Sequence, residues 1–294
     1  MKWEGNRESD NVEDRRSGGG LGGGGGLLGG RSIGIGTIVI ALVGGWVLGI
    51  NPLTILNLLS GGGAPVAVQQ QQSPAQRPPA DDRMAQFVST VLADTEDVWK
   101  DVFTKGGGSY REPTLVLFRG ATQTACGAGQ AAMGPFYCPA DQKVYIDLGF
   151  YETLKNRLGA PGDFAQAYVI AHEVGHHVQN LLGITGKMEE MRRRVNQTEY
   201  NALSVRLELQ ADCFAGVWAH HAQNARQILE KGDVEEAMNA AAKIGDDALQ
   251  RSSGGAVVPE SFTHGSSAQR QRWFDNGLKN GSVKACDTFS TRQL

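Results

Sequence analysis

An uncharged, apolar run from residue 33 to residue 50 divides this chain more sharply than any other feature. Its letters are IGIGTIVIALVGGWVLGI, and an apolar extension continues to residue 59 after a turn-prone Asn–Pro pair. A glycine-rich run precedes it, and a segment rich in Gly, Gln, Pro and Ala follows it. An uninterrupted apolar run of this length is what a helix needs to cross a bilayer. We therefore predict one transmembrane helix with an apolar extension over residues 33–59.

Two other interpretations of the apolar run stay open. A buried core helix would need a surrounding domain, which the low-complexity flanks do not provide. A cleaved signal peptide would need a shorter charged leader and a small-x-small cleavage site close behind it. Gly45 and Gly49 also form a GxxxG pattern. Glycine-rich spans produce that pattern by chance, so at most it predicts a weak homodimer through the transmembrane helix.

The apolar run also sets the expected domain organisation. Residues 1–32 mix charged residues with glycines, and we expect them to be disordered. Residues 60–80 have the composition of a flexible linker, and residues 81–294 are long enough to bury a core. Basic residues precede the run, and the next one is Arg77. The positive-inside rule then predicts a single-pass protein of the cytoplasmic membrane, with its N-terminus inside and its domain on the periplasmic or extracellular side.

The charge balance and the cysteine spacing exclude some classes of function and of metal site. The chain has 31 acidic and 28 basic residues, a balance that offers no basic surface for nucleic acid. Its four cysteines form no CxxC pair, so a thiolate zinc site is not expected. For a domain outside the cytoplasm we predict disulfides Cys126–Cys138 and Cys213–Cys286. The second would hold the C-terminal tail against the helix that carries residue 208.

The segment AHEVGHH, from residue 171 to residue 177, contains the pattern HExxH. On a helix, His172 and His176 lie one turn apart on the same face, where both imidazoles can bind one Zn2+. Glu173 is rotated by about 100° from His172. There it can act as the general base toward the water that zinc activates and pass the proton to the leaving amine. The alternative is an ordinary amphipathic helix with exposed histidines.

A catalytic zinc site needs a third protein ligand and one open position. Leu182 stands where a metzincin would place its third histidine, which excludes that class. Glu208 and Asp212 lie four residues apart beside an apolar helix face, where carboxylates are costly unless they are paired or bound to metal. We assign Glu208 as the third ligand and Asp212 as the acceptor that orients a ligand histidine. The alternative is that both carboxylates form surface pairs with Arg206 or another neighbour.

Several other polar residues near these motifs have less specific patterns. His177 points off the ligand face, so we expect it behind the ligands or at the surface. His264 or Arg270 could stabilise the oxyanion of a tetrahedral intermediate, although a loop histidine is more often ordinary surface. His220 and His221 end a helix, where cations suit the helix dipole, and we prefer that account to a second metal.

Residue periodicity predicts a mostly helical α+β domain with a small sheet. We expect strands at 113–118 and 143–148, and the second would pair with extended substrate if it lies at an edge rather than in the interior. Helices are expected at 82–103, 163–182, 199–224, 234–250 and 266–277, the last capped by Ser266 and ended by Gly277.

These motifs resemble the bacterial family called putative neutral zinc metallopeptidases. The resemblance covers nearly the whole chain and includes the opening MKWEG, the strand YIDL, HExxH and the run ELQAD. HExxH followed by ExxAD also resembles the gluzincin peptidases, including their integral-membrane CAAX-type and heat-shock-type branch. There the residue matching Glu208 binds metal and the one matching Asp212 supports the site. The resemblance implies a zincin-like domain behind one membrane span, with Zn2+ as cofactor.

The predicted function is peptide-bond hydrolysis by a membrane-anchored zinc metalloendopeptidase. Its partners would be protein or peptide substrates, and the bilayer through residues 33–50. The alternative is a catalytically silent zinc-binding scaffold or adaptor at the membrane. Glu173 favours the enzyme, because a structural zinc site does not need a general base. A hydrolase of non-peptide amides is a third hypothesis, for which no residue selects a substrate.

Overall fold

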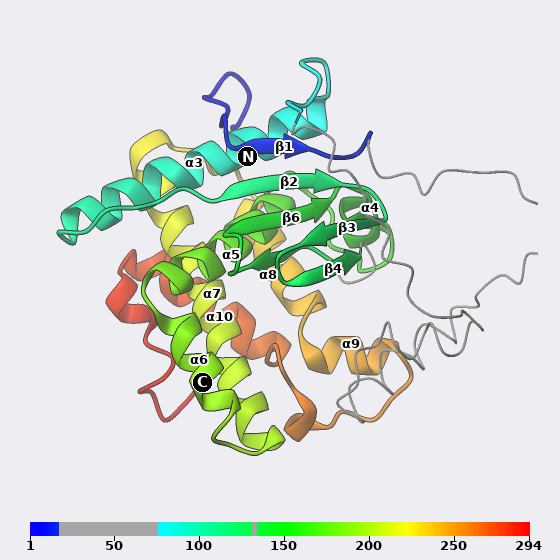
Figure 1. The fold of residues 1–294 in the computed structure, drawn as a ribbon, viewed down its shortest axis with the longest axis vertical. Coiled ribbons are helices and arrows are strands. Elements are labelled where there is room, and N and C mark those ends of the chain that lie inside the picture. The colour runs from blue at the N-terminus through cyan, green and yellow to red at the C-terminus, as the bar shows by residue number, and fades with distance from the viewer. Residues whose placement is uncertain (18–75, 131–133) are drawn as a thin grey trace, which may run out of the picture. The chain divides into compact units, whose positions relative to one another are not determined.

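The computed structural model describes residues 1–17, 76–130 and 134–294. These residues form the mostly helical α+β fold with a small sheet that the sequence predicts (Figure 1). The elements, in chain order, are β1 (Val12–Asp14), α3 (Arg83–Lys105), β2 (Thr114–Phe118), β3 (Ala121–Thr124), β4 (Gly127–Gln130), β5 (Phe136–Cys138), β6 (Lys143–Asp147), α4 (Gly149–Asn156), α5 (Asp163–Leu181), α6 (Ile184–Arg192), α7 (Gln197–Arg226), α8 (Asp233–Lys243), α9 (Asp246–Ser252), the 3-10 helix η2 (Pro259–Ser261), α10 (Ser267–Asn280) and the 3-10 helix η3 (Val283–Cys286).

The main sheet has four strands in the order β1-β2-β6-β5. β1, β2 and β6 run parallel, and β5 is antiparallel to β6. Leu115 and Ile146 face the main core, whereas Val116 and Tyr145 face a smaller cluster on the other side. Burial on both faces explains the unbroken apolar run of β2. The two predicted strands are confirmed, but β6 is interior, so the expectation of a substrate-pairing edge there is wrong.

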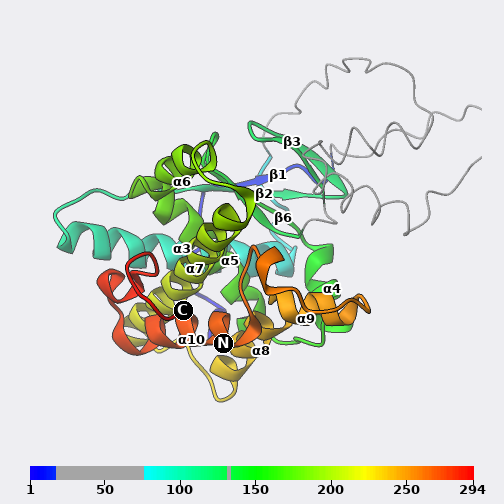
Figure 2. The same cartoon turned by 90° about the horizontal axis from the view of Figure 1, so that it is seen from below.

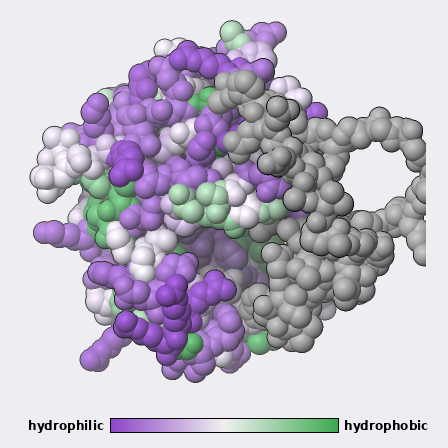
Figure 3. Space-filling model, viewed as in Figure 1, coloured by the Kyte–Doolittle hydropathy of each residue, from purple (hydrophilic) through white to green (hydrophobic). Residues whose placement is uncertain are grey.

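Helices pack on the sheet and on one another around α5. This helix contacts β5 and β6 and also α3, α7 and α8, and in Figure 2 these helices lie beneath the sheet. Trp99, Phe164, Phe214 and Trp218 are completely buried between them. On the face drawn in Figure 3, hydrophilic side chains predominate and the apolar areas are smaller. Burial of most of its surface makes α5 a rigid platform for the two histidines that it carries.

The predicted helices are present, with two differences. The helix expected at 234–250 is divided into α8 and α9, because the chain at Gly245 passes close to α10: a β-carbon there would lie 2.5 Å from the Ser267 nitrogen. Ser266 caps α10 as predicted. The helix runs past Gly277 to Asn280. Gly277 instead allows close contact with α7, since a β-carbon would collide with the Cys213 carbonyl oxygen.

Residues 1–17 are an ordered part of the domain, so the predicted disorder of residues 1–32 is wrong for this part. β1 adds a parallel strand to β2. The chain then rejoins the domain beside β1, where the Gln76 carbonyl accepts a hydrogen bond from the Asp14 nitrogen at 2.7 Å. The folded domain therefore includes a segment that precedes residue 81.

A buried carboxylate on α3 depends on this N-terminal segment. Glu96 is only 1% exposed. It accepts hydrogen bonds from Arg7 at 2.9 Å, from Ser9 at 2.5 Å and from Asn11 at 2.9 Å. Trp3 packs edge-on against Phe87 of the same helix. The polar residues whose composition suggests disorder are therefore the hydrogen-bond and ion-pair partners of a buried carboxylate.

The other predicted N-terminal segments lie outside the described residues. These are the rest of the disordered segment, the transmembrane helix and extension at 33–59, and most of the linker. In the described ranges, no helix is both long enough and apolar enough to cross a membrane.

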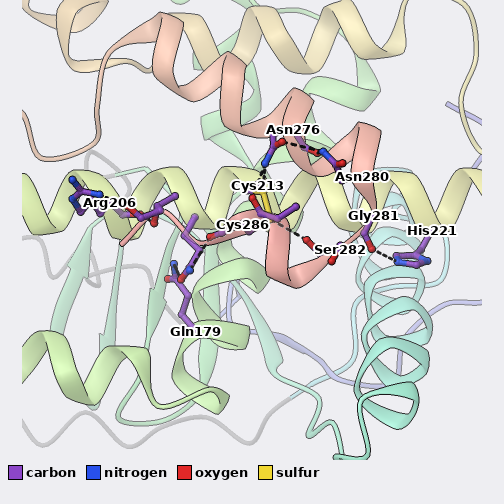
Figure 4. Close-up of a disulfide and its surroundings, with 12 residues drawn as sticks. Gln179, Arg206, Cys213, His221, Asn276, Asn280, Gly281, Ser282 and Cys286 are labelled. Atoms are coloured by element: carbon purple, nitrogen blue, oxygen red, sulfur yellow. Dashed lines mark hydrogen bonds between the residues drawn. A yellow bond between two sulfur atoms is a disulfide. The ribbon is translucent and has the colours of Figure 1, made fainter. Parts of the chain in front are cut away.

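Both predicted disulfides are present. Cys126–Cys138 joins the turn between β3 and β4 to the end of β5, and Cys213–Cys286 joins α7 to η3. Figure 4 shows the second bridge with Asn276 of α10 beside it, and the Asn276 amide donates to the Ala285 carbonyl at 2.7 Å. The C-terminal segment is therefore fixed to both helices.

The fold predicts that residues 1–17 are needed for stability and that residues 18–75 are not. Replacing 18–75 by a short Gly–Ser linker should leave the melting temperature within a few degrees of the full chain. Removing residues 1–75 should lower stability by about 3 kcal/mol or more, because Glu96 loses its ion pair and hydrogen bonds and β2 loses its neighbouring strand. Thermal and urea unfolding of the two variants measures the difference. Equal stability of both would contradict the assignment of β1 to the domain.

Candidate metal centre

Three metal-binding side chains meet where α5 passes α7. His172 and His176 come from α5 and Glu208 from α7, and one donor atom of each lies within 4.8 Å of the others. The His172 Nε2 atom is 3.2 Å from Glu208 Oε2, and the His176 Nε2 atom is 3.5 Å from Glu208 Oε1. The residues predicted as zinc ligands are thus brought together.

The spacing of these atoms fits a zinc ion. Ligands bound at about 2.0–2.2 Å in a tetrahedron lie about 3.3–3.6 Å from one another. The separations of 3.2 and 3.5 Å, one to each oxygen of Glu208, are close to that edge. Two imidazoles and one carboxylate are a ligand set of catalytic zinc sites, in which the fourth position stays open.

Hydrogen bonds on the far side of each imidazole orient it for metal binding. The Nδ1 atom of His172 lies 2.8 Å from Asp212 Oδ1, and that of His176 lies 2.9 Å from Gln179 Oε1. The Gln179 amide donates to the Leu207 carbonyl at 2.7 Å, which fixes its oxygen toward His176. Both Nδ1 atoms then carry the proton, and both Nε2 lone pairs face Glu208.

Asp212 is completely buried and surrounded by donors. Arg270 of α10 donates to both of its oxygens, at 2.8 and 2.9 Å, and the Tyr168 hydroxyl donates to the oxygen that faces His172. Burial opposes ionisation, but the charge of Arg270 and the hydrogen bonds from Arg270 and His172 outweigh it and lower the pKa of Asp212 to about 2. Asp212 is therefore a permanent anion behind His172.

Glu173 lies beside the cluster with its side chain buried. Among the described residues, none donates a hydrogen bond to its carboxylate. Burial raises the pKa of Glu173 from its ordinary value, while the nearby His176 and His172 partly oppose that shift. A raised pKa makes this carboxylate a stronger base, which suits a group that takes up and releases a proton.

His264 is held at the start of α10 by Asp246. The two side chains approach to 3.3 Å, and Asp246 Oδ2 accepts the backbone N–H groups of Thr263, His264 and Gly265 at 2.8, 2.6 and 2.9 Å. His264 itself is half-exposed. Arg270, the other predicted oxyanion-stabilising residue, is directed at Asp212 instead.

The other histidines are bound elsewhere. His177 is buried, with its Nδ1 atom 3.0 Å from the Tyr137 hydroxyl and its Nε2 atom 2.6 Å from the Arg111 carbonyl oxygen. His220 contacts the Leu278 carbonyl. His221 contacts the Gly281 carbonyl (Figure 4). None of the three joins His172 and His176 in a metal-binding group of the described residues.

Sequence reasoning missed two features of the centre. These are the hydrogen bond between His176 and Gln179 and the pairing of Arg270 with Asp212. Gln179 follows His176 by three positions, which places it on the same side of α5. That spacing could have indicated it. Arg270 is distant in sequence, and nothing in its local pattern indicates a buried carboxylate as its partner.

Comparison with known proteins agrees with this centre. The family model described as putative neutral zinc metallopeptidase matches residues 1–289. The uncharacterized protein YpfJ of Escherichia coli K12 is 53% identical over 98% of this chain and 99% of its own length. The uncharacterized protein Rv2575 of Mycobacterium tuberculosis H37Rv is 42% identical over 67% of this chain and 68% of its own length. No solved structure matches the chain.

The centre predicts one zinc per chain, lost when any of its ligands is removed. His172→Ala, His176→Ala and Glu208→Ala should each reduce the zinc content of the purified full chain to less than about a tenth, because two remaining ligands bind zinc weakly. His220→Ala is the matched control and should keep full zinc. Elemental analysis after dialysis measures the content. Full zinc in all three ligand variants would contradict the assignment.

Proposed function

Because the chain belongs to the putative neutral zinc metallopeptidase family, we propose that it hydrolyses peptide bonds with zinc held by His172, His176 and Glu208. The observation that carries the proposal is the convergence of two imidazole Nε2 atoms on the two oxygens of one carboxylate, at separations close to those between ligands of one zinc ion. The buried Glu173 beside them distinguishes a catalytic centre from a structural one.

Bound zinc would supply a Lewis acid that polarises the scissile carbonyl and lowers the pKa of a water molecule. Glu173 is the general base: its carboxylate takes a proton from the attacking water and later donates it to the leaving amine. The raised pKa of Glu173, which burial causes, suits both steps. Asp212 and Gln179 keep the two imidazoles in the metal-binding tautomer throughout.

His264 is the best candidate to stabilise the negative charge that forms on the carbonyl oxygen. Burial lowers the pKa of His264, whereas Asp246 and Glu208 raise it. The net effect is a pKa above the ordinary value for histidine. An imidazole N–H on a loop fixed by three backbone hydrogen bonds to Asp246 can donate to an oxyanion. Arg270 is excluded from that role by its two bonds to Asp212.

Extended substrate is best accommodated along β5. This strand is at the edge of the four-stranded sheet in the described residues and packs directly on α5. Its residue Tyr137 contacts His177, the neighbour of a zinc ligand. An edge strand binds a peptide through main-chain hydrogen bonds, which require little of the peptide's sequence. We therefore propose a protein or peptide substrate in extended conformation, cleaved by endopeptidase action.

Contact with the cytoplasmic membrane through residues 33–50 remains part of the proposal. It is supported by the length and apolar composition of that run. A weak homodimer through Gly45 and Gly49 has only the GxxxG spacing in its favour.

Glu173→Gln should separate catalysis from metal binding. The variant should keep full zinc, because Glu173 is not a ligand, and lose about 10²- to 10⁴-fold in the rate of cleaving a denatured protein, because the general base is gone. Glu190→Gln, on an exposed side chain of α6, is the control and should cleave normally. If zinc-loaded wild type cleaves no denatured protein, the scaffold hypothesis replaces the peptidase.

A further inference from the structure

We propose that Arg270 is a positioning residue, which holds the metal-binding face of His172 in place through Asp212. The proposal rests on the zinc centre proposed above. Arg270 is only 2% exposed. Its Nε atom donates to Asp212 Oδ2 at 2.8 Å and its Nη2 atom to Oδ1 at 2.9 Å. Two parallel bonds from a planar guanidinium fix both the position and the plane of a carboxylate.

The fixed carboxylate determines the orientation of His172. Oδ1 of Asp212 accepts from the His172 Nδ1 atom at 2.8 Å as well as from Arg270 and the Tyr168 hydroxyl. Rotation of the carboxylate away from His172 would break both bonds to Arg270. A lysine in this position could reach one oxygen with a point charge but could not hold both.

Arg270 also connects the zinc centre to α10. Its Nη1 atom donates to the Ile244 carbonyl at 3.2 Å, just beyond α8. α10 lies close against α7 where Gly216 and Gly277 face the other helix, since a β-carbon on either would collide with the opposite backbone. Arg270 and Asp212 therefore link the position of α10 to the orientation of His172.

Arg270→Lys tests the proposal, with Arg272→Lys on the same helix as the matched control. Competition against a chromophoric chelator should show zinc affinity of the first variant reduced by about 10- to 100-fold, as for loss of other groups that orient metal ligands, and that of the second unchanged. This readout needs no peptide cleavage, so failure of the peptidase proposal would leave it intact. Wild-type zinc affinity in a destabilised Arg270→Lys variant would make Arg270 merely structural and overturn the proposal.

A second variant covers the case in which Arg270→Lys does not fold. Asp212→Asn combined with Arg270→Met removes both buried charges together, which is far less destabilising than removing one. If Arg270 acts through Asp212, the double variant should bind zinc no more weakly than Asp212→Asn alone. A further tenfold loss in the double variant would show an independent effect and overturn the proposal.

A separate observation concerns the membrane. We infer that residues 1–17 and residues 76–294 lie on the same side of any bilayer that the chain contacts. β1 is hydrogen-bonded into the sheet beside β2, with Val12 opposite Leu115. Glu96, Glu112 and Asp82 of the later segment bind side chains of the first. A chain that leaves this domain after residue 17 and rejoins it at residue 76 can cross a bilayer only an even number of times.

This inference replaces the expected arrangement of an inside N-terminus and an outside domain. That expectation depended on basic residues ahead of the apolar run. In the structure Arg7 pairs with Glu96 at 2.9 Å, Arg15 with Glu13 at 2.7 Å, and Arg16 with both Asp14 and Asp82. These arginines form ion pairs within the fold, so their presence before the run does not report orientation.

Single cysteine substitutions test the inference in the full chain. Asp10 and Glu190 have side chains that are 81% and 67% exposed. Asp10→Cys and Glu190→Cys are each treated with a membrane-impermeant maleimide in right-side-out and in inverted membrane vesicles. Both positions should be labelled in the same vesicle type. Labelling of one position in right-side-out vesicles and the other in inverted vesicles would overturn the inference.

Discussion

Helices α5 and α7 cross where Gly175 faces Ala211, so closely that a β-carbon on residue 175 would lie 3.0 Å from the Ala211 carbonyl oxygen. Gly175 lies between the two histidines in sequence, and Ala211 lies between Glu208 and Asp212. The small residues allow the helix axes to approach until side chains of both helices share one ion. A larger residue at either position would separate the carboxylates from the imidazoles, and the rest of the centre would lose its geometry.

Around this crossing, each imidazole is fixed by a different part of the fold. His172 is held by Asp212 and, through it, by α10. His176 is held by Gln179, whose amide also contacts Gln210, and Gln210 donates to the carbonyl of Cys286 at 3.0 Å. The Cys213–Cys286 disulfide therefore anchors the group that supports one ligand, while Arg270 anchors the group that supports the other. A buried polar network of this kind is stable only when every member has its partners.

Local patterns predicted the parts of the molecule that local physics determines. The HExxH spacing on an apolar helix placed His172 and His176, and the carboxylates at the edge of an apolar stripe indicated Glu208 and Asp212. The β-branched and aromatic runs of β2 and β6 indicated their strands. Ser266 was recognisable as a cap, because its side chain and that of Gln269 satisfy the first turn of α10.

Long-range pairing could not be predicted from those patterns. The first residues are polar and precede a glycine run, so their composition is that of a disordered tail, yet they supply a strand and the partners of Glu96. A glycine is typical of a helix end, but Gly277 lies inside α10 and allows that helix to contact α7. In each case the deciding interaction joins residues far apart in the chain, and a single sequence contains no record of which distant surface a residue contacts.

Zinc K-edge X-ray absorption of the purified full chain tests the central claim most directly. The account predicts a four-coordinate site with only nitrogen and oxygen neighbours at about 2.0–2.2 Å, including the outer-shell scattering of two imidazole rings. The imidazole signal should fall to one ring in His176→Ala loaded with excess zinc. Sulfur neighbours at about 2.3 Å, or a wild-type spectrum without imidazole scattering, would contradict the centre formed by α5 and α7.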